Sequence, residues 1–205
     1  MVRQNSISII ISLFLISCSS GNRQAFYLNE FPLEDVTLLD GPFREARDLN
    51  IKVLLEYDVD RLFATFRKEA GLSKKAELFP NLKGLDGHVA GHYLSAVAMN
   101  YAAVKNDECR RRMEYIISEL RECQEANGKN NPGWGLWYVG GAPNSKQIWS
   151  TLQKGDFTAY RAAWAPWYNI HKMYSGLRDA WLYAGNKEAK DIFLKFCDWR
   201  INITS

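Results

Sequence analysis

The sequence predicts an all-α fold made of helical hairpins, and three observations support this prediction. Apolar residues recur at three- and four-residue intervals in several segments of the 205-residue chain, a spacing that places them on one face of a helix. Short turns of Asn, Asp or Gly separate these segments. One paired-helix pattern also occurs twice at a fixed offset. Because hydrophobic residues make up 47% of the sequence and aromatic residues 13%, the composition supports a packed core and argues against disorder.

Residues 1–17 have the features of a secretion signal and are set apart from the fold. Arg3 precedes an uncharged, largely apolar run at residues 7–16. This run is shorter than the stretch of about 20 apolar residues that a membrane-spanning helix needs. We therefore expect residues 1–17 to be a lipoprotein signal peptide.

Cys18 follows Leu15-Ile16-Ser17, an order that resembles a bacterial lipobox, in which the cysteine is lipidated and becomes the new N-terminus. Polar Ser19-Ser20-Gly21-Asn22 then begins a tether that we assign to residues 18–30. The alternative is an ordinary signal peptide with an incidental cysteine. The expectation is an exported lipoprotein that the lipid on Cys18 anchors to a membrane, in the periplasm or on the cell surface.

The charge of the remaining chain is close to balanced. Without residues 1–17, which contribute Arg3 alone, the 26 basic residues become 25 against 23 acidic residues. Such a surface gives no sign of a nucleic-acid or strongly acidic partner. The three other cysteines, Cys109, Cys123 and Cys197, are too few and too widely spaced for a disulfide framework, and we interpret them as small buried residues on helices.

The predicted elements begin with Asp35–Leu39, which is either a short strand or an extended lead-in. The turn at residues 40–42 introduces a helix that runs to about Tyr57, since Pro42 suits a first helical turn. A shorter helix follows from about Asp60 to Glu69, and Gly71 closes it.

A helical hairpin is predicted next, after a loop at residues 78–87. Its first helix runs from Asp86 or Gly87 to about Val104 and its second from about Glu108 to Ala126. The inner face of the first helix carries small residues that allow another helix to approach closely, namely Ala90, Gly91, Ser95, Ala96 and Ala98.

Residues 127–161 are predicted to form one long loop, rich in Gly, Pro and Trp. A second helical hairpin follows at residues 168–184 and 188–202. The two hairpins share a pattern at an offset of 80 residues, because SAVAMNYAAVKNDE at 95–108 matches SGLRDAWLYAGNKE at 175–188 in its serine, aromatic, asparagine and glutamate positions. Repeated hairpins favour a solenoid or a closed α/α toroid, although chance similarity of two turns is the alternative.

The three histidines of the chain, His88, His92 and His171, lie near predicted helix starts. His88 and His92 are four residues apart, so both project from one helical face. This spacing is compatible with metal ligands, with structural histidines or with hydrogen bonding to a polar ligand, and the last interpretation is favoured over the other two.

Aromatic residues surround Pro166 just before His171, namely Trp164, Trp167 and Tyr168. Sugars bind where flat apolar faces lie next to polar donors and acceptors, although aromatic residues around a proline are also common core wedges. The carboxylates available for acid and base chemistry are Asp86, Glu77 and Asp156, but no spacing identifies a catalytic pair, and Asp86 is better explained as a helix N-cap.

The motifs together resemble the β-L-arabinofuranosidase glycoside hydrolases, families 127 and 146. The resemblance covers residues 31–199 and rests on four ordered stretches: VTLLDGPF at 36–43, DVDRL at 58–62, GLDGHVAGHYLSA at 84–96 and WAPWYNIHK at 164–172. It implies an (α/α)6 toroid of twelve helices with the active site at one end. Residues 31–205 are then the N-terminal portion of this catalytic barrel, about its first half.

The resemblance also implies a mechanism with a cysteine thiolate nucleophile, a zinc ion held by glutamate and cysteines, and a glutamate acid/base. All of these belong to later helices of the family, so we assign no catalytic residue within this chain and expect zinc only for a full-length family member. The resemblance carries sugar contact over to His88, His92 and His171, and to Tyr168 and Trp167.

The predicted function is a glycoside hydrolase that releases non-reducing-end β-L-arabinofuranose from plant-type oligosaccharides or polysaccharides. The 205-residue chain is expected to be an N-terminal fragment without activity of its own. A lipid-anchored carbohydrate-binding protein without catalysis is the alternative, and a degenerate gene product without function is a third.

Overall fold

A computed structural model describes residues 31–205 of the chain. The predicted signal peptide at residues 1–17, the lipidation of Cys18 and the tether at residues 18–30 lie outside the described residues and remain predictions. Within residues 31–205, no helix is both long and apolar enough to cross a membrane.

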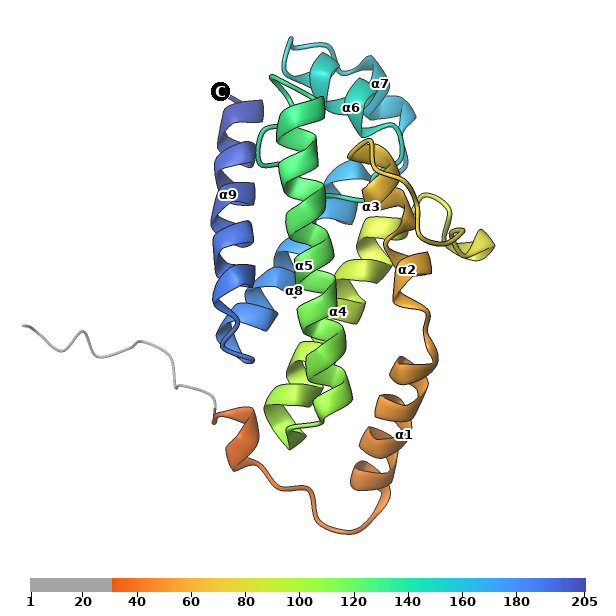
Figure 1. Cartoon of the computed structure of the whole chain (residues 1–205), viewed down its shortest axis with the longest axis vertical. Helices are drawn as coiled ribbons and strands as arrows, with labels where there is room; N and C mark the ends of the chain where they lie inside the picture. Colours follow the sequence, from red (N-terminus) through yellow and green to blue (C-terminus); the bar gives the residue numbers. More distant parts are fainter. Residues whose placement is uncertain (1–30) are drawn as a thin grey trace, which may run out of the picture. The chain divides into compact units, whose positions relative to one another are not determined.

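The described part of the chain is helical and contains no strand, which confirms the all-α prediction (Figure 1). Two short 3-10 helices precede the main hairpins, η1 (Leu33–Asp35) and η2 (Pro80–Leu82). The α-helices are α1 (Pro42–Glu56), α2 (Val59–Leu62), α3 (Ala64–Glu69), α4 (Asp86–Val104), α5 (Asp107–Asn130), α6 (Ser145–Leu152), α7 (Thr158–Ala162), α8 (Pro166–Leu182) and α9 (Lys187–Ile203).

The two predicted hairpins are α4–α5 and α8–α9, and they share the same turn chemistry. Asn106 precedes α5 and accepts a hydrogen bond from the backbone N–H of Cys109 at 2.9 Å. Asn186 precedes α9 and accepts one from Ala189 at 2.8 Å. Each asparagine therefore satisfies an N–H group that the first turn of a helix leaves unpaired. The repeated hairpin pattern is confirmed.

Helices α4 and α8 make the most extensive helix–helix contact of residues 31–205. Two glycines permit their close approach. A Cβ atom on Gly91 of α4 would lie 2.2 Å from the carbonyl oxygen of Lys172 on α8. A Cβ atom on Gly176 of α8 would lie 2.7 Å from the carbonyl oxygen of Gly91. The starts of α4 and α8, which carry all three histidines, are thereby held near one another.

The predicted long loop at residues 127–161 is wrong in three stretches, because α5 continues to Asn130, α6 lies within the range and α7 begins there at Thr158. Tertiary contacts stabilise α6. The Trp149 ring is fully buried and packs 5.2 Å from the Trp199 ring, measured between centroids. The carboxylate of Glu69 on α3 accepts hydrogen bonds from the backbone N–H groups of Asn144 and Ser145 at the start of α6. Both contacts join α6 to residues that are distant in the sequence, so a local sequence pattern does not predict this helix.

Three smaller predictions also need correction. The strand alternative at Asp35–Leu39 is wrong, because η1 ends at Asp35 and the residues after it form an irregular lead-in. The helix predicted from Asp60 to Glu69 is divided at Phe63 into α2 and α3. Helix α5 continues past Ala126, since the buried Asn127 side chain donates a hydrogen bond to the Tyr138 carbonyl and extends the packed region.

The interpretation of the cysteines as small buried residues on helices is confirmed for Cys109 and Cys123, whereas Cys197 lies on a helix but is only half-buried. Cys109 and Cys123 are buried on α5, Cys197 is half-buried on α9, and all three are free thiols. Burial raises the pKa of each thiol, to about 12 for Cys123. These are the environments of inert structural thiols.

Candidate functional site

The fully buried side chain of Asn169 joins the segment before α4 to the segment before α8. Its amide nitrogen lies within hydrogen-bonding distance of three carbonyl oxygens, those of Gly84 at 3.1 Å and of Trp164 and Ala165 at 3.2 Å. Its amide oxygen accepts a hydrogen bond from the backbone N–H of His88 at 3.2 Å. One side chain thus fixes two loops and the first turn of α4.

The turn before α8 has an unusual backbone conformation. Ala165 adopts a left-handed conformation, with φ 42° and ψ 56°, directly before Pro166. A non-glycine residue in this region is strained, and the residue before a proline is normally extended. Trp164 next to it is 72% exposed. The hydrogen bonds from Asn169 compensate part of this strain and hold the exposed indole at the start of α8.

His88, His92 and Tyr168 form a contiguous group across α4 and α8. The His88 ring stacks on the Tyr168 ring, with centroids 4.7 Å apart, and its Nε2 atom lies 3.0 Å from the Tyr168 hydroxyl. The His92 ring meets the His88 ring edge-on at 4.6 Å. Nδ1 of His88 is buried and has no hydrogen-bond partner among residues 31–205. The predicted shared face of His88 and His92 is confirmed.

His171 and Lys172 extend this group along α8. Nζ of Lys172 lies 5.4 Å from the centroid of the Tyr168 ring. Burial lowers the pKa of His88, and the charges of His92 and Lys172 lower it further. Burial likewise lowers the pKa of His92, together with the charges of Lys172 and His171. Both imidazoles are therefore mainly neutral at pH 7, a state in which each ring has one donor and one acceptor nitrogen.

Trp167 is directed away from the histidine group. Its half-buried ring packs 4.9 Å from the Trp149 ring, and the guanidinium of Arg200 covers it at 4.6 Å. The structure therefore brings His88, His92, His171 and Tyr168 to one region and places Trp167 on the side of the aromatic core.

The candidate carboxylates do not form a pair. Asp86 is buried, and it accepts hydrogen bonds from the Thr65 hydroxyl and from the backbone N–H of Gly84. The N-cap interpretation of Asp86 is wrong, because Leu85 occupies the cap position and Asp86 is the first residue of α4. Glu77 is exposed and pairs with Lys74, while exposed Asp156 accepts a hydrogen bond from the backbone of Thr158.

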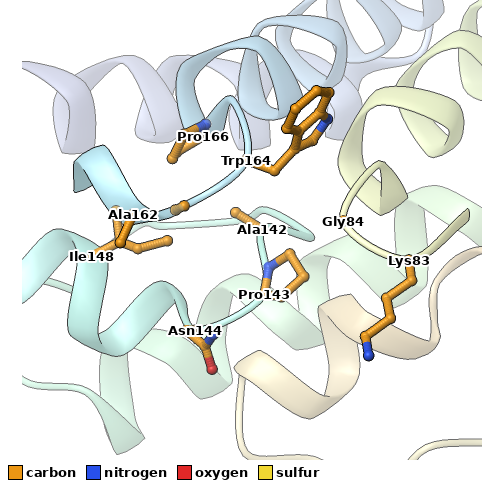
Figure 2. Close-up of a pocket in the computed structure, with 10 residues that line it drawn as sticks. Lys83, Gly84, Ala142, Pro143, Asn144, Ile148, Ala162, Trp164 and Pro166 are labelled. Carbon is orange, nitrogen blue, oxygen red and sulfur yellow. The ribbon is translucent and has the colours of Figure 1, made fainter. Parts of the chain in front are cut away.

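A cavity of about 340 Å³ lies beside the exposed Trp164. Figure 2 shows that its walls come mainly from three segments: Lys83 and Gly84 before α4, residues 142–144 before α6, and the stretch from Ala162 at the end of α7 to Pro166 at the start of α8. Ile148 of α6 also lines it. The cavity volume lies near the lower end of the range for small-molecule sites. Sequence reasoning missed the wall at residues 142–144, because only the folded chain brings this loop to the α4 and α8 starts.

Residues 31–205 contain no group of three or more His, Cys, Asp or Glu side chains placed to hold a metal ion. The three free cysteines are packed singly on α5 and α9. The described residues therefore do not fit the zinc site that the family resemblance implies, and we assign no step of a reaction to zinc here.

The helical hairpins gather imidazole, phenol and indole side chains at neighbouring helix starts, a combination of flat faces and hydrogen-bonding groups that suits a small polar ligand such as a sugar. The comparison with protein families points to a carbohydrate-active enzyme. Residues 35–205 match the model described as Beta-L-arabinofuranosidase, GH127 catalytic domain. Since the match covers most of the chain, the chain belongs to this glycoside hydrolase family, and the resemblance to family 127 is confirmed. A comparison with curated proteins finds no match.

Proposed function

We propose that this chain forms the sugar-recognition part of a glycoside hydrolase that releases β-L-arabinofuranose from the non-reducing ends of plant-type glycans. The observation that carries the proposal is the contact of His88 with both His92 on α4 and Tyr168 on α8, within a chain of the arabinofuranosidase family. His171 belongs to the same proposed site.

The chemistry of these side chains suits the hydroxyl groups of a sugar. Each hydroxyl of a sugar donates one hydrogen bond and accepts others, so a binding site needs both kinds of partner. The lowered pKa values of His88 and His92 favour neutral imidazoles, which provide both. The exposed Trp164 ring adds a flat apolar face near the same helix starts. Trp167 is less available to a sugar, because its half-buried ring packs against Trp149.

The catalytic groups are not assigned to described residues. A cysteine nucleophile acts as a thiolate, whereas burial raises the pKa of Cys109, Cys123 and Cys197 and favours their thiol forms. Asp86, Glu77 and Asp156 have separate structural or surface roles. We therefore propose that the 205-residue chain recognises the sugar without cleaving it, and that zinc and the reacting groups belong to a longer family member.

The test is arabinose release from a β-L-arabinofuranosyl glycoside, with the α anomer as the matched substrate control. The gene is sequenced past the Ser205 codon, and the 205-residue product and any longer product are assayed. Hydrolysis of the β anomer by a longer product would support the proposed glycosidase activity. This hydrolysis should be lost in the His88→Ala variant of that product and kept in its Asn202→Ala variant.

The second candidate is a carbohydrate-binding protein without catalysis. It is favoured because the proposed sugar-recognition residues have no pair of carboxylates beside them among residues 31–205. Sugar binding by every product and hydrolysis by none would support it. If no product binds or cleaves an arabinofuranoside, both candidates are contradicted.

We also propose that the protein is exported and anchored through a lipid on Cys18, on the strength of the Leu-Ile-Ser-Cys order after a short apolar run. Labelling of the expressing cells with a radioactive fatty acid is expected to mark the protein, and Cys18→Ser is expected to remove the label. Labelling of the Cys18→Ser variant at the level of the unchanged protein would contradict the anchor.

A further inference from the structure

Lys172 on α8 is a half-buried cation that forms no ion pair within residues 31–205. Its one described partner is the Tyr168 ring. Several other half-buried cations of residues 31–205 have carboxylate partners, as Arg121 and Lys195 have in Asp191, at 2.5 and 2.8 Å. A charge removed partly from water without a counterion is unfavourable, so this site is suited to an anion from outside the chain.

The groups that surround Lys172 are basic or neutral. His88 and His92 face it from α4, Tyr168 and His171 flank it on α8, and the charge of Lys172 contributes to the lowered pKa of both α4 histidines. His92 also lines a separate small pocket, and the other titratable side chains that line this pocket are those of Tyr57 and Tyr93.

The nearby carboxylates of the two helices are directed elsewhere. Asp86 of α4 accepts hydrogen bonds from Thr65 and Gly84, and Asp179 of α8 accepts one from Ser95 at 2.8 Å. His88 also lies in the first turn of α4, where the backbone N–H groups create a partial positive charge. The electrostatics of this region thus favour a negative group.

We propose that His88, His92, Tyr168, His171 and Lys172 form a subsite for the carboxylate of an acidic sugar, such as a uronic acid residue of the glycan. This proposal rests on the proposed function, since it names the class of glycan that the same site recognises. At neutral pH the permanent charge of the cluster is that of Lys172, because the lowered pKa values of His88 and His92 favour their neutral forms. A singly charged carboxylate matches this charge better than a phosphate group of nearly two charges does.

The test compares the affinities of the 205-residue protein for galacturonate and galactose, measured by calorimetric titration at pH 5.0 and pH 7.5. Galacturonate has a carboxylate where galactose has a hydroxymethyl group. Galacturonate is expected to bind about fivefold more tightly than galactose at pH 7.5, the ratio that one partly exposed ion pair provides. The preference is expected to increase at pH 5.0, where His88 and His92 bind more protons than at pH 7.5 while the sugar carboxylate stays ionised.

Lys172→Gln is expected to remove the preference at pH 7.5, whereas Lys190→Gln, on the exposed surface of α9, is expected to retain it. Equal affinities for the two sugars, or a preference that persists in Lys172→Gln, would overturn the proposal. Methyl β-L-arabinofuranoside serves as the reference ligand. If it binds while galacturonate shows no advantage, the acidic subsite fails and the proposed function stands, but if neither ligand binds, both fail.

Discussion

The side-chain oxygen of Asn169 on α8 accepts a hydrogen bond from the backbone N–H of His88 on α4, at 3.2 Å. The same amide holds the carbonyl groups of both helix-start loops. The position of the His88 imidazole against Tyr168 therefore depends on a buried residue that does not itself belong to the ring cluster.

Replacement of Asn169 by alanine should destabilise the protein by about 3 kcal/mol, because it removes four hydrogen bonds to partly buried backbone groups and leaves a cavity at a fully buried position. Urea unfolding followed by far-ultraviolet circular dichroism measures the change. Asn202→Ala, at an exposed position of α9, is the control and should change stability by less than about 0.5 kcal/mol. Equal stabilities of the two variants would show that Asn169 has no structural role.

Gly91→Ala should destabilise the protein by about 3 kcal/mol or more, since the added methyl group would lie 2.2 Å from the Lys172 carbonyl oxygen and force α4 and α8 apart. Gly128→Ala is the matched control within α5. Its added methyl group would meet Leu136 at an ordinary 3.5 Å, and alanine favours the helix by up to about 1 kcal/mol. Thermal unfolding of both variants distinguishes the positions. A Gly91→Ala protein as stable as Gly128→Ala would contradict the described packing.

Asp86→Asn should change how stability depends on pH. Burial raises the pKa of Asp86 above its ordinary value, although hydrogen bonds from Thr65 and Gly84 oppose this effect. The folded protein therefore holds the proton more tightly than the unfolded chain, and the contribution of Asp86 to stability falls as pH rises from about 4 through the folded pKa. Asparagine does not titrate.

The stability of Asp86→Asn relative to the unchanged protein should consequently increase over this pH interval, with a slope of at most about 1.4 kcal/mol per pH unit. Urea unfolding at pH 4, 5, 6 and 7 provides the comparison. A relative stability that decreases with rising pH would indicate a lowered pKa and contradict this account.

Much of the helical framework could be predicted from sequence because its signals are local. Apolar periodicity located α1, α4, α5, α8 and α9, and Asn106 and Asn186 marked two helix starts with their own side chains. Helices α6 and α7 were missed. The start of α6 is held by Glu69, which lies on α3 and is remote in sequence, so no local pattern contains its cause.

The candidate site was predicted to a similar extent. The four-residue spacing of His88 and His92 placed both rings on one face, as observed. The contact of His88 with Tyr168 depends on the close approach of α4 and α8 at Gly91, which spacing along the chain does not specify. Asn169 was overlooked because its importance comes from carbonyl groups of two separate loops. Its position in the first turn after Pro166, on the buried face of α8, was the available signal.

The most direct test of the central claim, that the histidine cluster recognises a furanose sugar, is a nuclear magnetic resonance titration of the imidazole protons with methyl β-L-arabinofuranoside. The chain has three histidines, so single His→Gln variants assign every imidazole signal. The account predicts saturable shifts of the His88 and His92 signals, weaker shifts with the α anomer, and the same response in the Asn202→Ala control. A folded protein whose three imidazole signals stay unchanged at saturating sugar would contradict it.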